Sequence, residues 1–213
     1  MLYEKLFKKS NNNLNYTYYL YCLIELKDFR SAEKLVKSQI KEFPDNLKYS
    51  VDLGYVYAEE GEQGKANKQF DETIKQIKPD RLQVTEAANS FLIRGQLDYA
   101  VASYRRGSEI IRDYPFYLEL GDLYNQVGNY SMMIDEYLNY LDYNYQNASL
   151  IQAKLQTALS NDAENKISEM LRKTLLKRVQ KYPEKIFYSE MLLWLSIQQK
   201  DFELAFTQAK SID

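Results

Sequence analysis

Catalytic side chains are scarce in this sequence of 213 residues. It contains no histidine and a single cysteine, Cys22, so imidazole acid–base catalysis, Ser–His and Cys–His nucleophile pairs and His- or Cys-based zinc sites are excluded. The 30 acidic residues include carboxylates that a glycosidase-like mechanism would need, but no motif, glycine-rich loop or ligand spacing selects a pair. We therefore predict that the chain is not an enzyme and holds no cofactor and no metal. A non-catalytic part of a larger enzyme or assembly factor stays open as an alternative.

The charge pattern argues against a nucleic-acid partner. The 28 basic and 30 acidic residues are interspersed and give a formal net charge of −2, so no basic surface is predicted for binding phosphates. The apolar stretch Tyr16 to Leu26 is about 11 residues long, which is too short to span a membrane. We expect a soluble protein without direct membrane insertion. The cytoplasm is favoured, and an exported form with a removed signal stays open, because a lone cysteine does not identify the compartment.

A regular spacing of small residues is the strongest pattern in the chain. Ala32, Ala66 and Ala100 recur at a constant interval, each within an apolar helical pattern. The segment Leu53–Tyr57 recurs about two such intervals later as Leu120–Tyr124. A fixed period of about 34 residues predicts stacked helical hairpins. The seven glycines and four prolines leave few turns between these helices.

These residues resemble the tetratricopeptide repeat, whose pattern runs W-x2-L-G-x2-Y, then A-x3-F, then P. The second repeat is most similar to it, with Leu53-Gly54, Tyr57, Ala66 and Phe70, while Ser50 stands where tryptophan is usual. The resemblance is strong up to residue 144 and weaker beyond. It implies an all-α fold, a right-handed superhelical solenoid of antiparallel helix hairpins.

The resemblance also implies one repeat array over residues 1–213. Its approximate repeats are 13–46, 47–80, 81–113, 114–147 and 148–183, followed by an incomplete one at 186–213. Residues 1–13 are expected to be the end of a preceding helix, and the chain to be part of a longer array.

Glycines are expected in two structural roles in these hairpins: close helix packing and helix termination. Gly54 lies inside a helix, where glycine costs about 1 kcal/mol relative to alanine. We expect Gly54 and Ala66 on the second helix to let the two helices cross closely, while Leu53, Tyr57 and Phe70 fill the space around the crossing. Gly61, Gly95 and Gly128 are instead expected in the left-handed conformation that ends a helix.

In the resembled family, the first helix of each pair lines a binding groove. When the repeats are aligned, the groove positions are occupied in this chain by aromatic, amide, hydroxyl and acidic residues: Thr17, Tyr21, Tyr55, Glu59, Asn89, Asp122, Asn125 and Gln126. Aromatic anchors with adaptable amides suit an extended or helical peptide. We therefore predict a protein–protein interaction scaffold whose partner is a protein or peptide of unknown identity. Glu25, Glu59 and Asp122 favour a neutral or basic segment.

Other classes of partner would leave their own signals in the sequence. Family members that grip a chaperone's C-terminal carboxylate use lysine and asparagine, and the corresponding positions here offer no cation, so that partner is rejected. A helical-repeat RNA reader with a period of about 35 residues is an alternative that the spacing and charge disfavour. Tyr16, Tyr18, Tyr19 and Tyr21 are expected to run around a helix and so form no stacking platform. Self-association through exposed array ends stays open.

Overall fold

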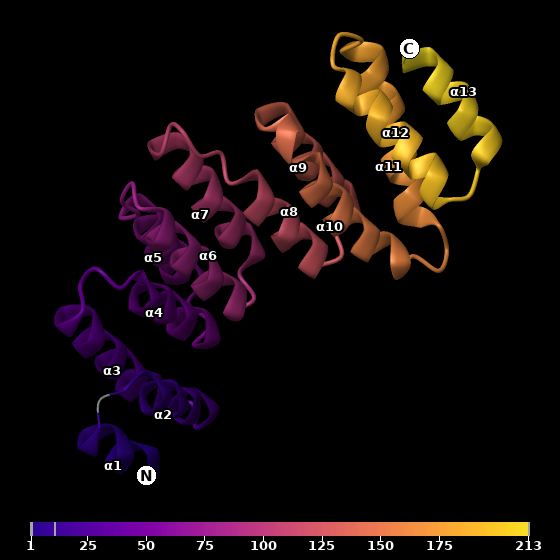
Figure 1. Ribbon diagram of the computed structural model, residues 1–213. Coiled ribbons are helices and arrows are strands. Elements are labelled where there is room, and N and C mark those ends of the chain that lie inside the picture. The colour runs from indigo at the N-terminus through magenta and orange to yellow at the C-terminus, as the bar shows by residue number, and fades with distance from the viewer. Residues whose placement is uncertain (1, 11, 213) are drawn as a thin grey trace. The chain divides into compact units, whose positions relative to one another are not determined.

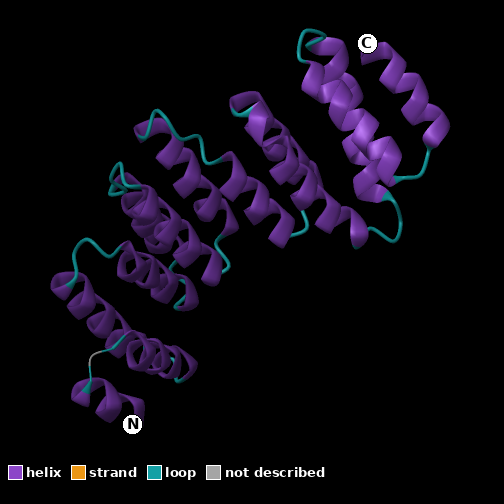
Figure 2. Ribbon diagram, viewed as in Figure 1, coloured by secondary structure: helices purple, strands orange, loops and turns teal. Residues whose placement is uncertain are grey.

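The computed structural model describes residues 2–10 and 12–212 of the chain, and within these ranges every regular element is a helix (Figure 2). The chain divides into two compact units, Met1–Phe116 and Tyr117–Asp213, which we call unit 1 and unit 2. The predicted all-α architecture of helical hairpins is confirmed. The helix expected over residues 1–13 includes Met1 and Asn11, which lie outside the described residues.

The described part of unit 1 forms a short helix followed by three hairpins (Figure 1). Its elements are α1 (Leu2–Lys9), α2 (Asn13–Glu25), α3 (Phe29–Glu42), α4 (Leu47–Glu59), α5 (Gln63–Lys75), α6 (Arg81–Ile93) and α7 (Leu97–Ile110). Helix α1 packs on α2, and α4 packs on both α5 and α6. The first helices of the hairpins are thus α2, α4 and α6.

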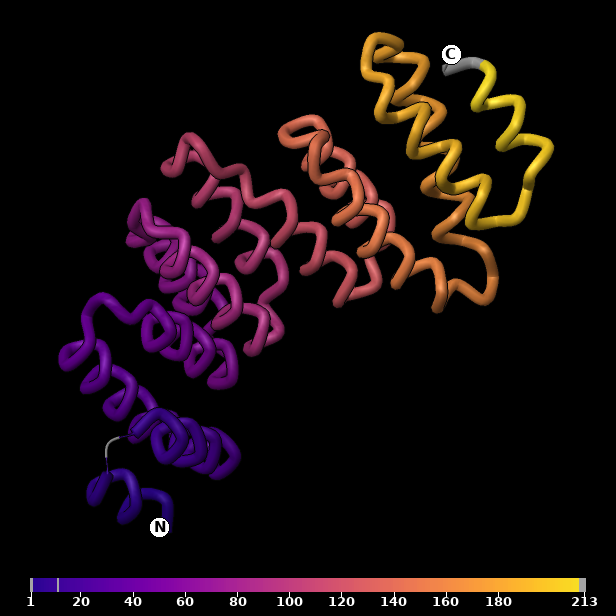
Figure 3. The backbone as a smooth tube through the Cα atoms, in the orientation of Figure 1, coloured from indigo at the N-terminus to yellow at the C-terminus, as the bar shows by residue number. Residues whose placement is uncertain are grey.

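Unit 2 continues the alternation of helices. Its elements are α8 (Tyr117–Gln126), α9 (Tyr130–Tyr143), the short 3-10 helix η1 (Tyr145–Asn147), α10 (Ala148–Ser160), α11 (Lys166–Lys181), α12 (Ile186–Gln198) and α13 (Phe202–Ile212). Within this unit α8 packs on α9, α11 packs on α9 and α12, and α12 packs on α13. Figure 3 shows the chain reversing at the short connections between paired helices.

Three glycines end first helices as predicted. Gly61, Gly95 and Gly128 have φ angles of 87°, 70° and 75°, in the left-handed region. The backbone N–H of the residue after Gly61, Glu62, donates to the carbonyl of Tyr57 at 2.9 Å, which closes the helix end. Lys27 stands in the equivalent turn of the first hairpin and adopts φ of 57° without being glycine.

The recurring small residues are buried at the centre of the hairpins. Ala32, Ala66 and Ala100 are each 0% exposed, on α3, α5 and α7. At Gly54 the three atoms nearest to an added Cβ all belong to the ring of Phe70. This aromatic side chain, one helical turn after Ala66, therefore fills the space over the glycine, as the sequence predicted for Phe70.

Large and small side chains compensate each other at this contact along the chain. Gly121 meets the ring of Tyr137 as Gly54 meets that of Phe70, and the two pairs have the same separation in sequence. At the equivalent positions of the other repeats, the buried pairs with this separation are Leu20 with Val36, Ala88 with Tyr104, and Leu155 with Leu171. Where the first position is Gly or Ala the second is aromatic, and where the first is Leu the second is aliphatic. Filling the interior at constant volume explains this exchange.

Candidate functional site

A buried carboxylate joins the three first helices of unit 1. Asp52 on α4 is 1% exposed. Its Oδ2 accepts a hydrogen bond of 2.9 Å from the hydroxyl of Tyr16 on α2. Its Oδ1 accepts from Nε of Arg94, the residue that follows α6, at 2.8 Å and pairs with Nη2 at 2.6 Å. Asp52 therefore fixes a face made of α2, α4 and the end of α6, which we call the first-helix face of unit 1.

The electrostatics of this cluster follow from its burial. Burial and the Asp52 carboxylate raise the pKa of Tyr16 well above the usual value for tyrosine, so its hydroxyl stays protonated and donates. Lys48 lies 4.9 Å from the centre of the Tyr16 ring, and burial lowers the pKa of this lysine. Arg94 compensates the charge of Asp52, which would otherwise be strongly unfavourable in the interior.

Arg94 also covers the ring of a predicted groove residue. Its Cζ lies 4.6 Å from the centre of the Tyr55 ring, within the range of a cation–π contact. Nε and Nη2 face Asp52, so Nη1 is left without an acceptor among the described residues. The Arg94 side chain is 14% exposed. Asp52 and Tyr55 thus hold the guanidinium in place, and its Nη1 group can donate a hydrogen bond to a partner.

An apolar hollow opens beside Arg94. Its volume is about 390 Å³, and the residues around it are Tyr3, Thr17, Tyr18, Tyr21, Cys22 and Arg94. The rings of Tyr3 and Tyr18 stack with their centres 5.2 Å apart. Tyr18 and Tyr21 are 46% and 59% exposed, which is high for aromatic side chains. We call this hollow the tyrosine pocket.

The tyrosine pocket involves two of the four tyrosines of α2. Tyr16, Tyr18, Tyr19 and Tyr21 point around α2, as expected, and Tyr16 is fully buried. Tyr18 and Tyr21 are nearly one helical turn apart and so lie on one side of the helix, where Tyr3 of α1 joins them. The expectation concerned α2 alone and did not include this contribution from α1.

The structure places the eight predicted groove residues in both units. Thr17 and Tyr21 line the tyrosine pocket. Tyr55 is half-buried under Arg94, and Glu59 on α4 and Asn89 on α6 are exposed in the same unit. The remaining three predicted residues lie on α8 of unit 2: Asp122, Asn125 and Gln126.

Asp122 does not supply the free negative charge that was expected of it. Its Oδ1 accepts from the hydroxyl of Tyr137 at 2.6 Å, and Nζ of Lys154 lies 2.7 and 2.8 Å from its two carboxylate oxygens. Lys154 therefore neutralises this carboxylate within unit 2. The acidic character predicted for the groove is limited to Glu25 and Glu59, both exposed in unit 1.

Sequence reasoning missed the residues that build the site from outside the repeat pattern. Arg94 was assigned only to a helix-ending turn, although its long side chain reaches Asp52 on a neighbouring first helix. Tyr3 belongs to α1, whose residues were assigned only to the end of a preceding helix. Asp52, between Val51 and Leu53 in an otherwise apolar part of α4, was the available signal, because a buried acid needs a cation from a neighbouring helix.

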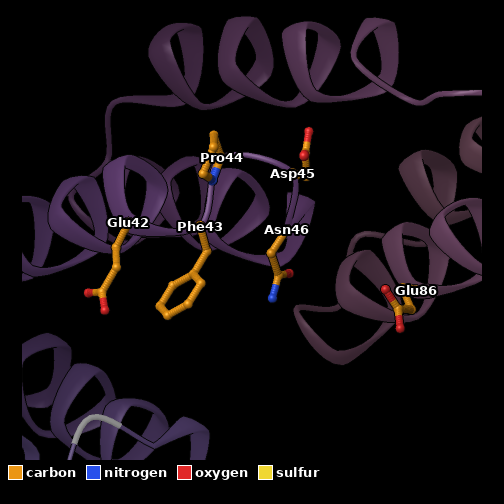
Figure 4. A pocket seen from close by; sticks show the side chains of 6 residues that line it. All are labelled: Glu42, Phe43, Pro44, Asp45, Asn46 and Glu86. Carbon is orange, nitrogen blue, oxygen red and sulfur yellow. The ribbon is translucent and has the colours of Figure 1, made fainter.

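Other hollows offer less defined chemistry. The hollow in Figure 4 has a volume of about 460 Å³ at the loop between α3 and α4, and Glu42, Phe43 and Asn46 extend to one side of that loop while Glu86 lies on α6. In unit 2 a hollow of about 250 Å³ is lined mainly by amides and hydroxyls, including Gln156. Neither combines exposed aromatic rings with a fixed cation.

Among the described residues, no group of three or more Cys, Asp or Glu side chains is arranged to hold a metal ion. No described helix combines the length and the apolar character needed to cross a membrane.

Comparison with known proteins gives a distant likeness among solved structures. No family model matches the chain. No curated protein matches it either. Among solved structures the chain is similar to a tetratricopeptide repeat protein from Parabacteroides merdae ATCC 43184, with 18% identity, coverage of 99% of this chain and 78% of that chain, and a TM-score of 0.33. The helical packing of the chain itself defines it as an all-α helical-repeat protein.

Proposed function

We propose that the chain is a non-catalytic protein-interaction scaffold that holds a peptide or protein segment on the first-helix face of unit 1. The observation that carries the proposal is the tyrosine pocket, where Tyr18 and Tyr21 remain exposed beside a fixed Arg94. Exposed aromatic rings around an apolar hollow are typical of interaction sites, because they bury a large area at a small entropic cost.

The order within the face supports binding of an extended or helical segment. Asp52, Tyr16 and Arg94 hold three helices in register from within, so the outer side chains need little reorganisation when a partner binds. Exposed Glu59 and Asn89 lie on the neighbouring helices and can hydrogen-bond polar groups of a segment. Exposed carboxylates disfavour a nucleic-acid backbone on the same face.

The proposal includes the assignment of the helix pairs to one kind of repeat. The pairs α2–α3, α4–α5, α6–α7, α8–α9, α10–α11 and α12–α13 would be copies of the repeat that the sequence resembles. The recurrence of buried small residues and of the evenly separated compensating pairs supports this assignment.

A display library of random dodecapeptides, selected on the full chain, tests the proposal. Selected peptides should bind the Tyr21→Ala variant at least tenfold more weakly, because truncation of a central aromatic anchor costs about 2 kcal/mol or more. Tyr145→Ala is the matched control, since Tyr145 is 62% exposed but lies in unit 2. The proposal fails when no peptide is enriched, or when enriched peptides bind Tyr21→Ala as well as the unchanged chain.

A further inference from the structure

Two first helices of unit 1 carry the same pair of side chains in the same register. Tyr21 and Glu25 on α2 correspond to Tyr55 and Glu59 on α4, one repeat later. In each pair the carboxylate follows the ring by about one helical turn, so both side chains lie on one side of the helix. The structure therefore contains two copies of an aromatic–acid pair on adjacent helices.

The second copy has a cation of its own. The ring of Tyr55 is covered by Arg94, which caps the C-terminus of the next first helix, α6. The residue in the same position relative to Tyr21 is the C-cap of α4, and it is Glu60. A carboxylate thus stands where the other copy has a guanidinium. Tyr21 accordingly remains 59% exposed, whereas Tyr55 is half-buried.

We propose that an arginine or lysine side chain of the partner segment takes the place over Tyr21 that Arg94 takes over Tyr55, while an apolar side chain next to it in the segment enters the tyrosine pocket. This inference rests on the proposed function and specifies its partner. Arg94 serves as the internal example of the contact, because it shows a guanidinium over this ring position at 4.6 Å.

The charges around Tyr21 favour this occupant. Glu25 and Glu60 are both exposed. Burial raises the pKa of Tyr55 most, and the Glu59 and Glu25 carboxylates raise it further, which places the Glu25 carboxylate near the neighbouring helix as well. Lys27 is the first basic residue after α2, and it is exposed in the turn. Arg94 adds no net charge here because Asp52 balances it.

The helical register limits the sequence of the segment. Side chains one turn apart on a helix have Cβ atoms about 5–6 Å apart, and an extended peptide advances about 3.3 Å per residue. The basic residue should therefore lie no more than a few positions from the apolar anchor.

The dodecapeptide selection on the full chain gives the first readout. Enriched peptides should carry arginine or lysine within a few positions of an aromatic or large aliphatic residue. One such peptide is then synthesised with its basic residue changed to glutamine, and its affinity at low salt should fall about fivefold to thirtyfold, which combines a cation–π contact with an exposed ion pair. Reversing the charge of one of the two carboxylates of the chain, with Glu25→Lys or Glu60→Lys, should lower the affinity for the unchanged peptide to a similar extent.

A matched control separates this inference from the function on which it rests. Glu72 is an exposed carboxylate on α5, a second helix, so Glu72→Lys changes the net charge equally and should leave affinity unchanged. Peptides that depend on Tyr21 but show no basic preference, or that tolerate Glu25→Lys and Glu60→Lys, would overturn the inference and leave the scaffold function standing. Peptides that are indifferent to Tyr21→Ala, or an empty selection, would overturn both.

Discussion

Replacing Gly54 with alanine probes the contact between the two helices of the second hairpin. An added Cβ would lie 2.2 Å from Cε1 and 2.4 Å from Cδ1 of the Phe70 ring, whereas unstrained carbon atoms stay about 3.5–4.0 Å apart. The ring has little room to move, because Phe91 and Tyr99 contact it with centres 5.4 and 4.9 Å away. The substitution therefore forces the helices apart or distorts the ring.

The expected change in stability follows from two opposing terms. Overpacking of a well-packed core costs about 1–3 kcal/mol, and this contact belongs in the upper part of that range because the ring is fully buried. Alanine in place of glycine inside a helix stabilises by about 1 kcal/mol. We expect a net loss of about 1–2 kcal/mol in the free energy of unfolding.

Urea unfolding followed by circular dichroism measures this change, with Gly64→Ala as the matched control. Gly64 lies in α5, and an added Cβ there meets nothing within 4 Å, so the control should leave stability unchanged or raise it slightly. Combining Gly54→Ala with Phe70→Leu should cost less than the sum of the single changes, with a coupling of about 1 kcal/mol or more. The reasoning is refuted when Gly54→Ala raises the urea midpoint as Gly64→Ala does.

Three further substitutions test other parts of the structure by the same unfolding assay. Lys27→Gly should stabilise the chain by about 1 kcal/mol, because Lys27 holds a φ of 57° that Gly61 adopts freely one repeat later; an equal or lower midpoint would contradict this. Asp52→Ala should cost about 3–5 kcal/mol, because it leaves the Arg94 guanidinium buried without its carboxylate; a loss below about 1 kcal/mol would show that the pair is not structural. Tyr16→Phe should flatten the fall in stability at alkaline pH. The raised pKa of Tyr16 in the folded state means that its contribution is complete below pH of about 10 and is lost as pH rises further, because the unfolded chain releases the proton first. Parallel pH profiles of the variant and the unchanged chain would refute the Tyr16 assignment.

Much of the fold could be predicted because local rules and the repeat period agree. Ala32, Ala66 and Ala100 are small and regularly spaced, and their burial follows from the need of paired helices to approach each other. The turn glycines were recognisable because only glycine adopts the left-handed conformation at no cost. Lys27 in the same conformation gave no such signal, since lysine is not a residue type that indicates a left-handed backbone.

Contacts that depend on particular distant partners could not be predicted in the same way. Gly107 in α7 was not singled out, yet an added Cβ would meet Phe116 and Val84 at 2.7 Å each. The prediction rested on the alanines and on Gly54 and Gly121, and it did not extend to this position of the second helix. The pairing of Asp52 with Arg94 likewise depends on a flexible side chain that crosses between helices.

For the candidate site, phase within the repeat identified Thr17 and Tyr21 on the tyrosine pocket, and Tyr55 beside it. The position within the repeat could not reveal which tyrosine ring is covered by a side chain of the chain itself. That depends on whether the C-cap of the next first helix is Arg94 or Glu60. Only the three-dimensional structure shows that the Tyr55 ring is covered by a cation while the Tyr21 ring is exposed.

Nuclear magnetic resonance mapping of a selected peptide on the isotope-labelled chain tests the scaffold proposal most directly. The largest shift changes should fall on the backbone amides of Thr17, Tyr21 and Tyr55, with little change at Asn125 and Gln126 of unit 2. Changes centred on α8, or on the loop of Glu42 and Asn46, with none at Tyr21 would contradict it.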